Sequence, residues 1–108
     1  MIEPMALLKA STRDAMTYAK ISHEAVLAGN QNALVAASYA NAALAKCSLV
    51  EALYYTKYED SNTELEVFFL KLHTYVNEVL RNIKDDHSHQ WSDIEYHELE
   101  KQFQKLDF

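Results

Sequence analysis

The scarcity of glycine and proline restricts the fold of this chain more than any other feature of its sequence. Among 108 residues there is one proline, Pro4, and one glycine, Gly29. Beta sandwiches, barrels and Rossmann-type folds use Gly and Pro at many of their turns, and this chain cannot supply them. Alanine, the strongest helix former, occurs fourteen times. The sequence therefore predicts an all-α fold.

The length and the helical segments together predict one helical-bundle domain over 1–108. The chain has the size of one ordinary domain, and 49 % of its residues are hydrophobic, which is enough to bury a core. Pro4 and Gly29 bracket a first helix, and polar stretches at 59–63 and 85–90 separate three more. Because short connections bring consecutive helices side by side in opposite directions, we expect an antiparallel up-down bundle of three long helices plus a shorter C-terminal helix.

Each expected helix has its own apolar pattern. The first, which ends before Gly29, has a narrow seam of small residues, and the second, about 32–57, has alanines around almost its whole circumference. Such a second helix is predicted to lie centrally and to contact several neighbours at once. The third, over 65–83, has the clearest three-and-four spacing, and the fourth begins at Ser92. The seam of the first helix consists of Leu8, Thr12, Ala15, Ala19, Ser22 and Val26.

Two of the helix starts carry a capping-box pattern, in which Ser or Thr is followed three residues later by Glu. The third helix offers this pattern at Ser61 and again at Thr63. The fourth offers it at Ser92, preceded by Trp91 as a hydrophobic staple. We therefore expect these residues to cap the two helices.

Charge is unevenly distributed along the chain, whose net charge is −6. Residues 1–57 carry five cations and four anions, a net charge of +1, whereas 58–108 carry five cations and twelve anions, a net charge of −7. An acidic half repels phosphate backbones, so nucleic-acid binding is not expected and a basic or neutral protein partner is favoured. The alternative is that the acidic residues form only a solvated face that keeps a small bundle soluble.

The N-terminus and the cysteine content favour the cytoplasm. Met1–Pro4 has no basic stretch before an apolar run, and no window approaches about 18 uninterrupted apolar residues, so neither export nor a membrane span is expected. Cys47 is the one cysteine and cannot form an internal disulfide, which fits a reducing compartment. We therefore expect a cytoplasmic protein with no cofactor.

One group of residues has the composition of a metal site. Asp85, His87 and His89 stand close together before the fourth helix, and their oxygen and imidazole ligands suit zinc or another first-row ion. A stable site also needs surrounding groups that hold its ligands in place, and no Glu-x-x-His pair stands on either long helix nearby. A solvated linker is therefore the favoured interpretation of this stretch.

Two further groups invite a functional interpretation. Cys47 could act as a nucleophile if His23 or His73 approached it, although a free cysteine on an alanine-rich helix is more often a small buried hydrophobe. His73, Asn77 and Arg81 recur every four residues and form a polar line on the third helix. This line is either an ordinary exposed face or a groove in which Arg and His bind an anion or move a proton.

An alanine-rich helix punctuated by aromatic residues, Ala28–Lys46, follows a short turn, and Arg81-Asn82 is followed by His87. This pattern resembles HEPN bundles, in which catalytic members carry an Arg, a polar residue and a nearby His. The resemblance covers about residues 10–90. It implies a dimeric, metal-independent ribonuclease or a relative of one. In that case Arg81 would stabilise phosphate charge, His87 would act as acid and base, and Asn82 would assist.

Two helices over Asp14–Leu53, with Gly29-Asn30 between them, are followed by a helix that ends at 82–86. This arrangement is similar to flagellar export chaperones of the FliS type. These chaperones bind an unfolded export substrate without catalysis. The resemblance implies a protein-binding bundle with no active site.

Taken with the missing catalytic motifs, these patterns favour a non-enzymatic helical-bundle interaction protein, an adaptor, chaperone or inhibitor, whose acidic C-terminal half binds a protein partner. The alternative is a HEPN-type ribonuclease or toxin, or its non-catalytic relative. Aromatic rings near helix ends suit an interface, so a homodimer or a partner complex is expected, unless these rings only close the ends of a monomer. The residues expected at the partner surface are Tyr54, Tyr55, Tyr58, Phe69, Trp91, Glu95 and Glu98.

Overall fold

The computed structural model describes residues 3–57, 61–85 and 88–108, with Asn30 described by its backbone only. Within these ranges the protein is all-helical and has no strand, as the scarcity of Gly and Pro predicts. A single 3₁₀ turn, η1, stands between the first two of four α-helices. The elements are α1 (Pro4–Leu27), η1 (Asn30–Asn32), α2 (Ala33–Lys57), α3 (Thr63–Lys84) and α4 (His89–Leu106).

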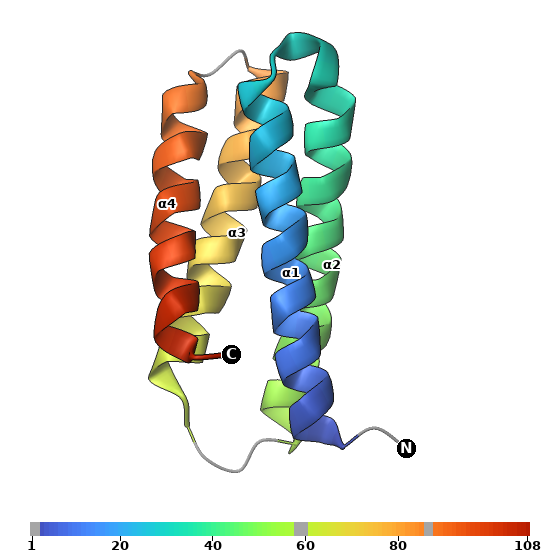
Figure 1. The fold of residues 1–108 in the computed structure, drawn as a ribbon, viewed down its shortest axis with the longest axis vertical. Helices are drawn as coiled ribbons and strands as arrows, with labels where there is room; N and C mark the ends of the chain where they lie inside the picture. The colour runs from blue at the N-terminus through green and yellow to red at the C-terminus, as the bar shows by residue number, and fades with distance from the viewer. Residues whose placement is uncertain (1–2, 58–60, 86–87) are drawn as a thin grey trace.

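The four helices lie side by side along the longest dimension of the molecule, which measures 42 × 25 × 19 Å (Figure 1). The most extensive packing joins α1 to α2, followed by the packing of α3 on α4. The two pairs are joined mainly through α2 and α3, and α1 touches α4 over a smaller area. Both ends of the chain lie toward the same end of the bundle.

The first helix begins and ends where its sequence predicts. The Glu3 carboxylate caps α1 by accepting hydrogen bonds from the backbone N–H groups of Met5 and Ala6, and Pro4 occupies the first turn, where no N–H is needed. After the helix, Gly29 has φ +113°, a conformation that side-chain-bearing residues rarely adopt. The predicted seam is buried except for Val26, which is half-buried; the buried residues are Leu8, Ser11, Thr12, Ala15, Met16, Ala19, Ser22 and His23.

The capping residues of α3 and α4 differ from those predicted. Asn62 caps α3, because its side-chain oxygen accepts a hydrogen bond from the Leu65 N–H at 3.0 Å. Ser88 caps α4 in the same way and starts that helix four residues earlier than expected. Ser92 is instead fully buried inside α4, and its hydroxyl donates to the His89 carbonyl at 2.9 Å. The Ser/Thr–Glu spacing indicated the wrong residues because neither observed cap has it: Leu65 stands three residues after Asn62, and Trp91 stands three residues after Ser88.

The position of α2 also differs from expectation. It packs against α1 and α3 and is covered on one side only, so it is not a central helix. Alanines around the whole circumference allow close packing on any side, but α1 and α3 between them cover only one side. The buried residues of α2 are Ala36, Ala40, Ala43, Cys47, Val50 and Tyr54.

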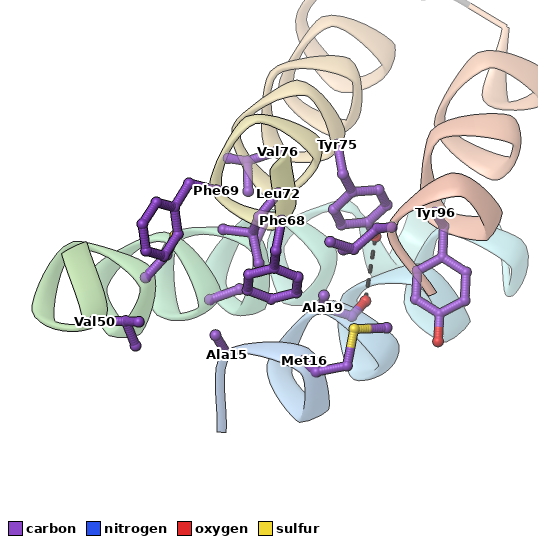
Figure 2. Packing of buried hydrophobic residues seen from close by; sticks show 14 of the residues in the cluster. Ala15, Met16, Ala19, Val50, Phe68, Phe69, Leu72, Tyr75, Val76 and Tyr96 are labelled. Carbon is purple, nitrogen blue, oxygen red and sulfur yellow. Dashed lines mark hydrogen bonds between the residues drawn. The ribbon is translucent and has the colours of Figure 1, made fainter. Parts of the chain in front are cut away.

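The core is built on the inward face of α3 (Figure 2), whose predicted three-and-four spacing is confirmed from Leu65 to Val79, whereas Leu80 and Ile83, expected on the same face, are exposed. Phe68 and Leu72 are fully buried over the small residues of α1 and α2. Tyr75 is also fully buried, and its hydroxyl donates to Ser22 Oγ at 3.1 Å and to the Ala19 carbonyl at 3.4 Å. No buried side-chain nitrogen or oxygen of the described residues lacks a hydrogen-bond partner. The core therefore combines apolar packing with satisfied polar groups.

Candidate functional site

Three of the predicted partner residues form an aromatic cluster where α2 ends and α3 begins. The ring centroids of Tyr54 and Tyr55 are 4.9 Å apart, and Phe69 lies 5.7 Å from the first and 6.3 Å from the second. Tyr54 and Phe69 are buried, and the Tyr54 hydroxyl donates to Glu66 at 2.6 Å while accepting from the Asn62 N–H at 2.8 Å. These two buried rings therefore pack the end of α2 against the start of α3. Tyr55, which is 67 % exposed, is the member of the cluster that faces solvent.

The other predicted partner residues lie elsewhere. Trp91, Glu95 and Glu98 are all on α4, where Trp91 is exposed and the two glutamates are half-buried. Glu98 lies 3.6 Å from Lys101 one turn along the same helix. Tyr58 is outside the described residues. The structure thus places the predicted set on two separate parts of the bundle, one on α2 and α3 and the other on α4.

The exposed side of α2 is the most unusual surface of the described protein. We define the outer face of α2 by the exposed residues between Leu34 and Thr56, which are Leu34, Val35, Ser38, Asn41, Ala45, Ser48, Leu49, Ala52, Tyr55 and Thr56; the exposed Lys57, the last residue of the helix, follows this face and is not part of it. None of these residues is charged, and Leu34 at one end is 80 % exposed. The charged residues between them, Lys46 and Glu51, are half-buried and directed to neighbouring helices, where they lie 3.6 Å from Asp14 and 3.1 Å from His73.

The helix that carries this face is also relevant to the expectation that the chain has no membrane span. Among the described residues, α2 is the one helix that is long and apolar enough to cross a membrane by length and composition alone. Its apolar window has a mean hydropathy of 1.4, and 28 % of that window is buried inside the bundle.

Two of the three residues of the ribonuclease-like pattern, Arg81 and Asn82, lie in the described part of the chain, at the end of α3. Arg81 is exposed near the end of α3 and donates to Glu78 one turn earlier at 3.2 Å. Asn82 is half-buried. His87 lies outside the described residues. Of the polar line on α3, His73 is engaged with α2 through Glu51, so the line does not form one continuous free surface.

The predicted metal residues are spread across the connection from α3 to α4. Asp85 follows the last turn of α3 and His89 begins α4, and both are exposed. His87 is outside the described residues. Among the described residues, two other sets of possible ligands lie close together: one on α1 and α4, and one on α2 and α3.

A cluster of two histidines and one aspartate joins α1 to α4. His23 Nε2 lies 2.8 Å from Asp93 Oδ1, and His97 Nε2 lies 3.4 Å from the same oxygen. The hydrogen bond with His23 lowers the pKa of Asp93 below its ordinary value, and the nearby imidazoles of His97 and His89 act in the same direction. His23 and Asp93 are 70 residues apart, so no local motif reveals their pairing, and the spacing of Asp93 and His97 by four on one helix is the available sequence signal.

The ring of His23 is held in a defined orientation. It stacks on Tyr96 with a centroid distance of 4.1 Å and an interplanar angle of 5°. Burial raises the pKa of Tyr96 to about 12, so its hydroxyl stays protonated at neutral pH. An open groove of about 390 Å³ runs beside this cluster between α1 and α4 and is lined in part by Tyr96 and Glu100.

Cys47 behaves as the favoured interpretation predicts. It is fully buried in α2, and burial, with a smaller contribution from the charge of Glu51, raises the pKa of its thiol to about 12. A nucleophilic cysteine needs the opposite shift. His73 and Glu51 lie within reach of the thiol, but both sit toward the surface and are paired with each other.

No family model, no curated protein and no solved structure matches this chain. The function therefore has to be argued from the geometry of the bundle itself.

Proposed function

We propose that this protein is a non-enzymatic helical-bundle interaction protein, an adaptor, chaperone or inhibitor, that binds a helix of a partner protein along the outer face of α2. One observation carries the proposal: an exposed helix face that runs from Leu34 to Thr56 without a charged residue. The exposed surface of a small bundle normally mixes many charged residues with its apolar ones, and interface cores are depleted of charge. Because the face has no charged side chain, its burial against a partner avoids the large free-energy cost of removing charges from water.

The pattern along the face suits a helix as its occupant. From Leu34 to Tyr55 the face spans about 32 Å, at about 1.5 Å per residue. Its central positions alternate in steps of three and four, which is the spacing of a helix–helix seam. Along its central line the face carries small side chains such as Ala45 and Ser48, which let another backbone approach closely; larger apolar side chains stand at its ends, Leu34 and Tyr55, and beside that line, Leu49.

The charge of the molecule supports a role in association. Most of the excess negative charge lies in 58–108, whereas the outer face of α2 has none. In this proposal the acidic C-terminal half attracts a basic or neutral partner over a distance, and the outer face provides the buried contact. Complementary charge mainly raises the association rate, so binding should weaken as salt increases.

The proposal includes the arrangement of the bundle. It holds that the helices follow an antiparallel up-down order, with α4 as the shorter member. The helix lengths of 24, 25, 22 and 18 residues support α4 as the shorter member. The position of both chain ends at one end of the bundle supports the antiparallel order, because an up-down bundle of four helices returns the chain to its starting end (Figure 1).

Site-specific photo-crosslinking in cells of the source organism tests the proposal. A photoreactive residue at Ala45 or Ser48 should crosslink to one defined protein, and its yield should fall with added salt in a cell extract. The same residue at Thr74, an exposed position on α3, serves as the matched control and should not capture that protein. Equal capture from all three positions, or crosslinks to lipid alone, would overturn the proposal. A crosslink to a second copy of the chain would identify the partner as the protein itself.

A further inference from the structure

We propose that His23, Asp93 and His97 form a binding site for a divalent transition-metal ion, with Zn²⁺ as the best match, that joins α1 to α4. The inference rests on the placement of three ligand atoms and is independent of the proposed protein-binding role. The three side chains come from two helices that pack only lightly against each other. An ion held between them would therefore add a link to the small contact that α1 and α4 make through the core.

The spacing of the ligand atoms is close to that of a zinc site. Nε2 of His23, Oδ1 of Asp93 and a ring nitrogen of His97 all lie within 4.8 Å of one another. Ligand bonds of about 2.0–2.2 Å in a tetrahedral site place neighbouring ligand atoms roughly 3.3 Å apart. The separation of 3.4 Å between Asp93 and His97 already fits, and the 2.8 Å hydrogen bond between His23 and Asp93 must lengthen by about half an ångström.

The surroundings hold the ligands in place. Stacking on Tyr96 fixes the ring plane of His23, whose side chain is 9 % exposed. The second nitrogen of His97, Nδ1, lies 4.0 Å from the Glu100 carboxylate, which is beyond hydrogen-bond distance in this structure. Metal-bound histidines usually donate their other N–H to such a carboxylate, so a movement of about 1 Å would let Glu100 orient the ring.

The site would leave one coordination position open. Asp93 and His97 have side chains that are 38 % and 55 % exposed, so an ion bound to them is reached by water. Three protein ligands with one open position is the pattern of zinc sites that also bind water or an exogenous ligand. Glu100, beside His97, and Tyr96, beside His23, also line the groove between α1 and α4. The groove therefore lies next to the side chains that contact the two histidines.

The donor set selects the class of ion. Two imidazole nitrogens and one carboxylate oxygen suit zinc and its first-row neighbours, whereas Mg²⁺ and Ca²⁺ prefer sites made of oxygen. A second group, Cys47, Glu51 and His73, also lies close enough to share an ion. Its thiol is fully buried and its raised pKa opposes the thiolate that binds metal, so the structure favours the α1–α4 cluster.

Metal titration of the chelator-stripped full-length chain tests the proposal. We expect calorimetry with Zn²⁺ at neutral pH to show one ion per chain, and Mg²⁺ to give no heat. Co²⁺ should produce the visible absorption of a four-coordinate site. Because the ion binds ligands that are assembled only in the folded protein, saturating Zn²⁺ should raise Tm by about 5 °C or more.

Variants assign the ion to these residues. His97→Gln is the main test, because His97 is exposed and its loss leaves the core intact; it should weaken Zn²⁺ binding by more than about tenfold. Asp93→Asn should do the same, with an unchanged circular dichroism spectrum. His73→Gln and Cys47→Ser are the matched controls and should bind as the natural protein does. Absence of Zn²⁺ binding, binding unchanged in His97→Gln, or loss of binding in His73→Gln would each overturn the proposal.

Discussion

At the scale of single residues, the fold makes several potentially reactive side chains unreactive. A cysteine, a tyrosine and a histidine that look chemically versatile in the sequence are occupied by packing or by neighbours. Tyr75 is buried with its hydroxyl bonded to α1, and burial raises its pKa above the ordinary range. His73 is engaged with Glu51 across α2 and α3. The type of a residue therefore suggests which reactions its side chain could perform, but long-range packing decides whether that side chain is accessible and unpaired enough to perform them.

Cys47 should resist modification in the native protein. With a thiol pKa of about 12, fewer than about one thiol in 10³ is ionised at pH 8, and the sulfur has no exposed surface. We expect a thiol-reactive disulfide reagent to label Cys47 only as fast as the bundle opens, and to label it at once in denaturant. Rapid labelling without denaturant would show that the thiol reaches solvent and would reopen its role as a nucleophile.

Arg81 provides the residue-scale test of the ribonuclease alternative. Its guanidinium is exposed and bonded to Glu78, and the surrounding half of the chain is acidic, so we expect the purified protein to leave a mixed RNA pool intact without metal. Gel analysis of the pool provides the measurement. If cleavage is seen, and Arg81→Ala abolishes it while helicity is unchanged, the HEPN-type alternative replaces the interaction proposal.

At the scale of elements, α3 offers a matched pair of leucines. Leu72 is fully buried in the core, and Leu70, two residues earlier, is 68 % exposed. Leu72→Ala should lower the free energy of unfolding by about 2–5 kcal/mol because it leaves a cavity. Leu70→Ala should change it by no more than about 0.5 kcal/mol. Urea unfolding measures both values, and similar losses in the two variants would contradict the orientation of α3.

The start of α3 tests which residue caps the helix. Asn62→Ala removes the acceptor for the Leu65 N–H and should cost about 1 kcal/mol of unfolding free energy. Ser61→Ala is the control, because Ser61 is exposed and is not the capping residue. Urea unfolding of the two variants decides between the observed cap and the predicted one; a larger loss for Ser61→Ala would favour the predicted box.

The helices themselves could be predicted because periodicity and punctuation are local properties. The apolar spacing of α3 and the Pro4 start of α1 follow from neighbouring residues and are confirmed. The predicted cap of α4 was wrong because only Ser92 has a Glu three residues later, whereas its burial, which depends on distant helices, leaves Ser88 as the cap. The prediction that α2 is a central helix was wrong for a related reason. An arc of alanines gives no sign of which part a neighbour will cover, and the pairing of His23 with Asp93 exists only in the folded bundle.

At the scale of the whole molecule, the outer face of α2 makes self-association the expected behaviour when no other partner is present. Sedimentation at micromolar concentration should show a species heavier than the 12.4 kDa chain, in a concentration-dependent manner. Leu49→Arg places a charge on the face and should return the protein to a monomer, because burying an unpaired charge is costly. Leu70→Arg, on α3, is the control and should leave the association unchanged. A monomer at every concentration would show that the face is not used between copies.

The close pairing of α1 with α2 through the short turn at Gly29 has a consequence for the order in which the protein forms. Helices that are adjacent in the chain lose little entropy when they meet, so this hairpin can assemble faster than the contacts that require the full sequence. During synthesis it emerges from the ribosome before α3, which supplies the large core side chains. Until α3 arrives, α2 exposes both its uncharged outer face and the part of its inner face that α3 later covers, so this is the interval in which the nascent chain is most prone to aggregate.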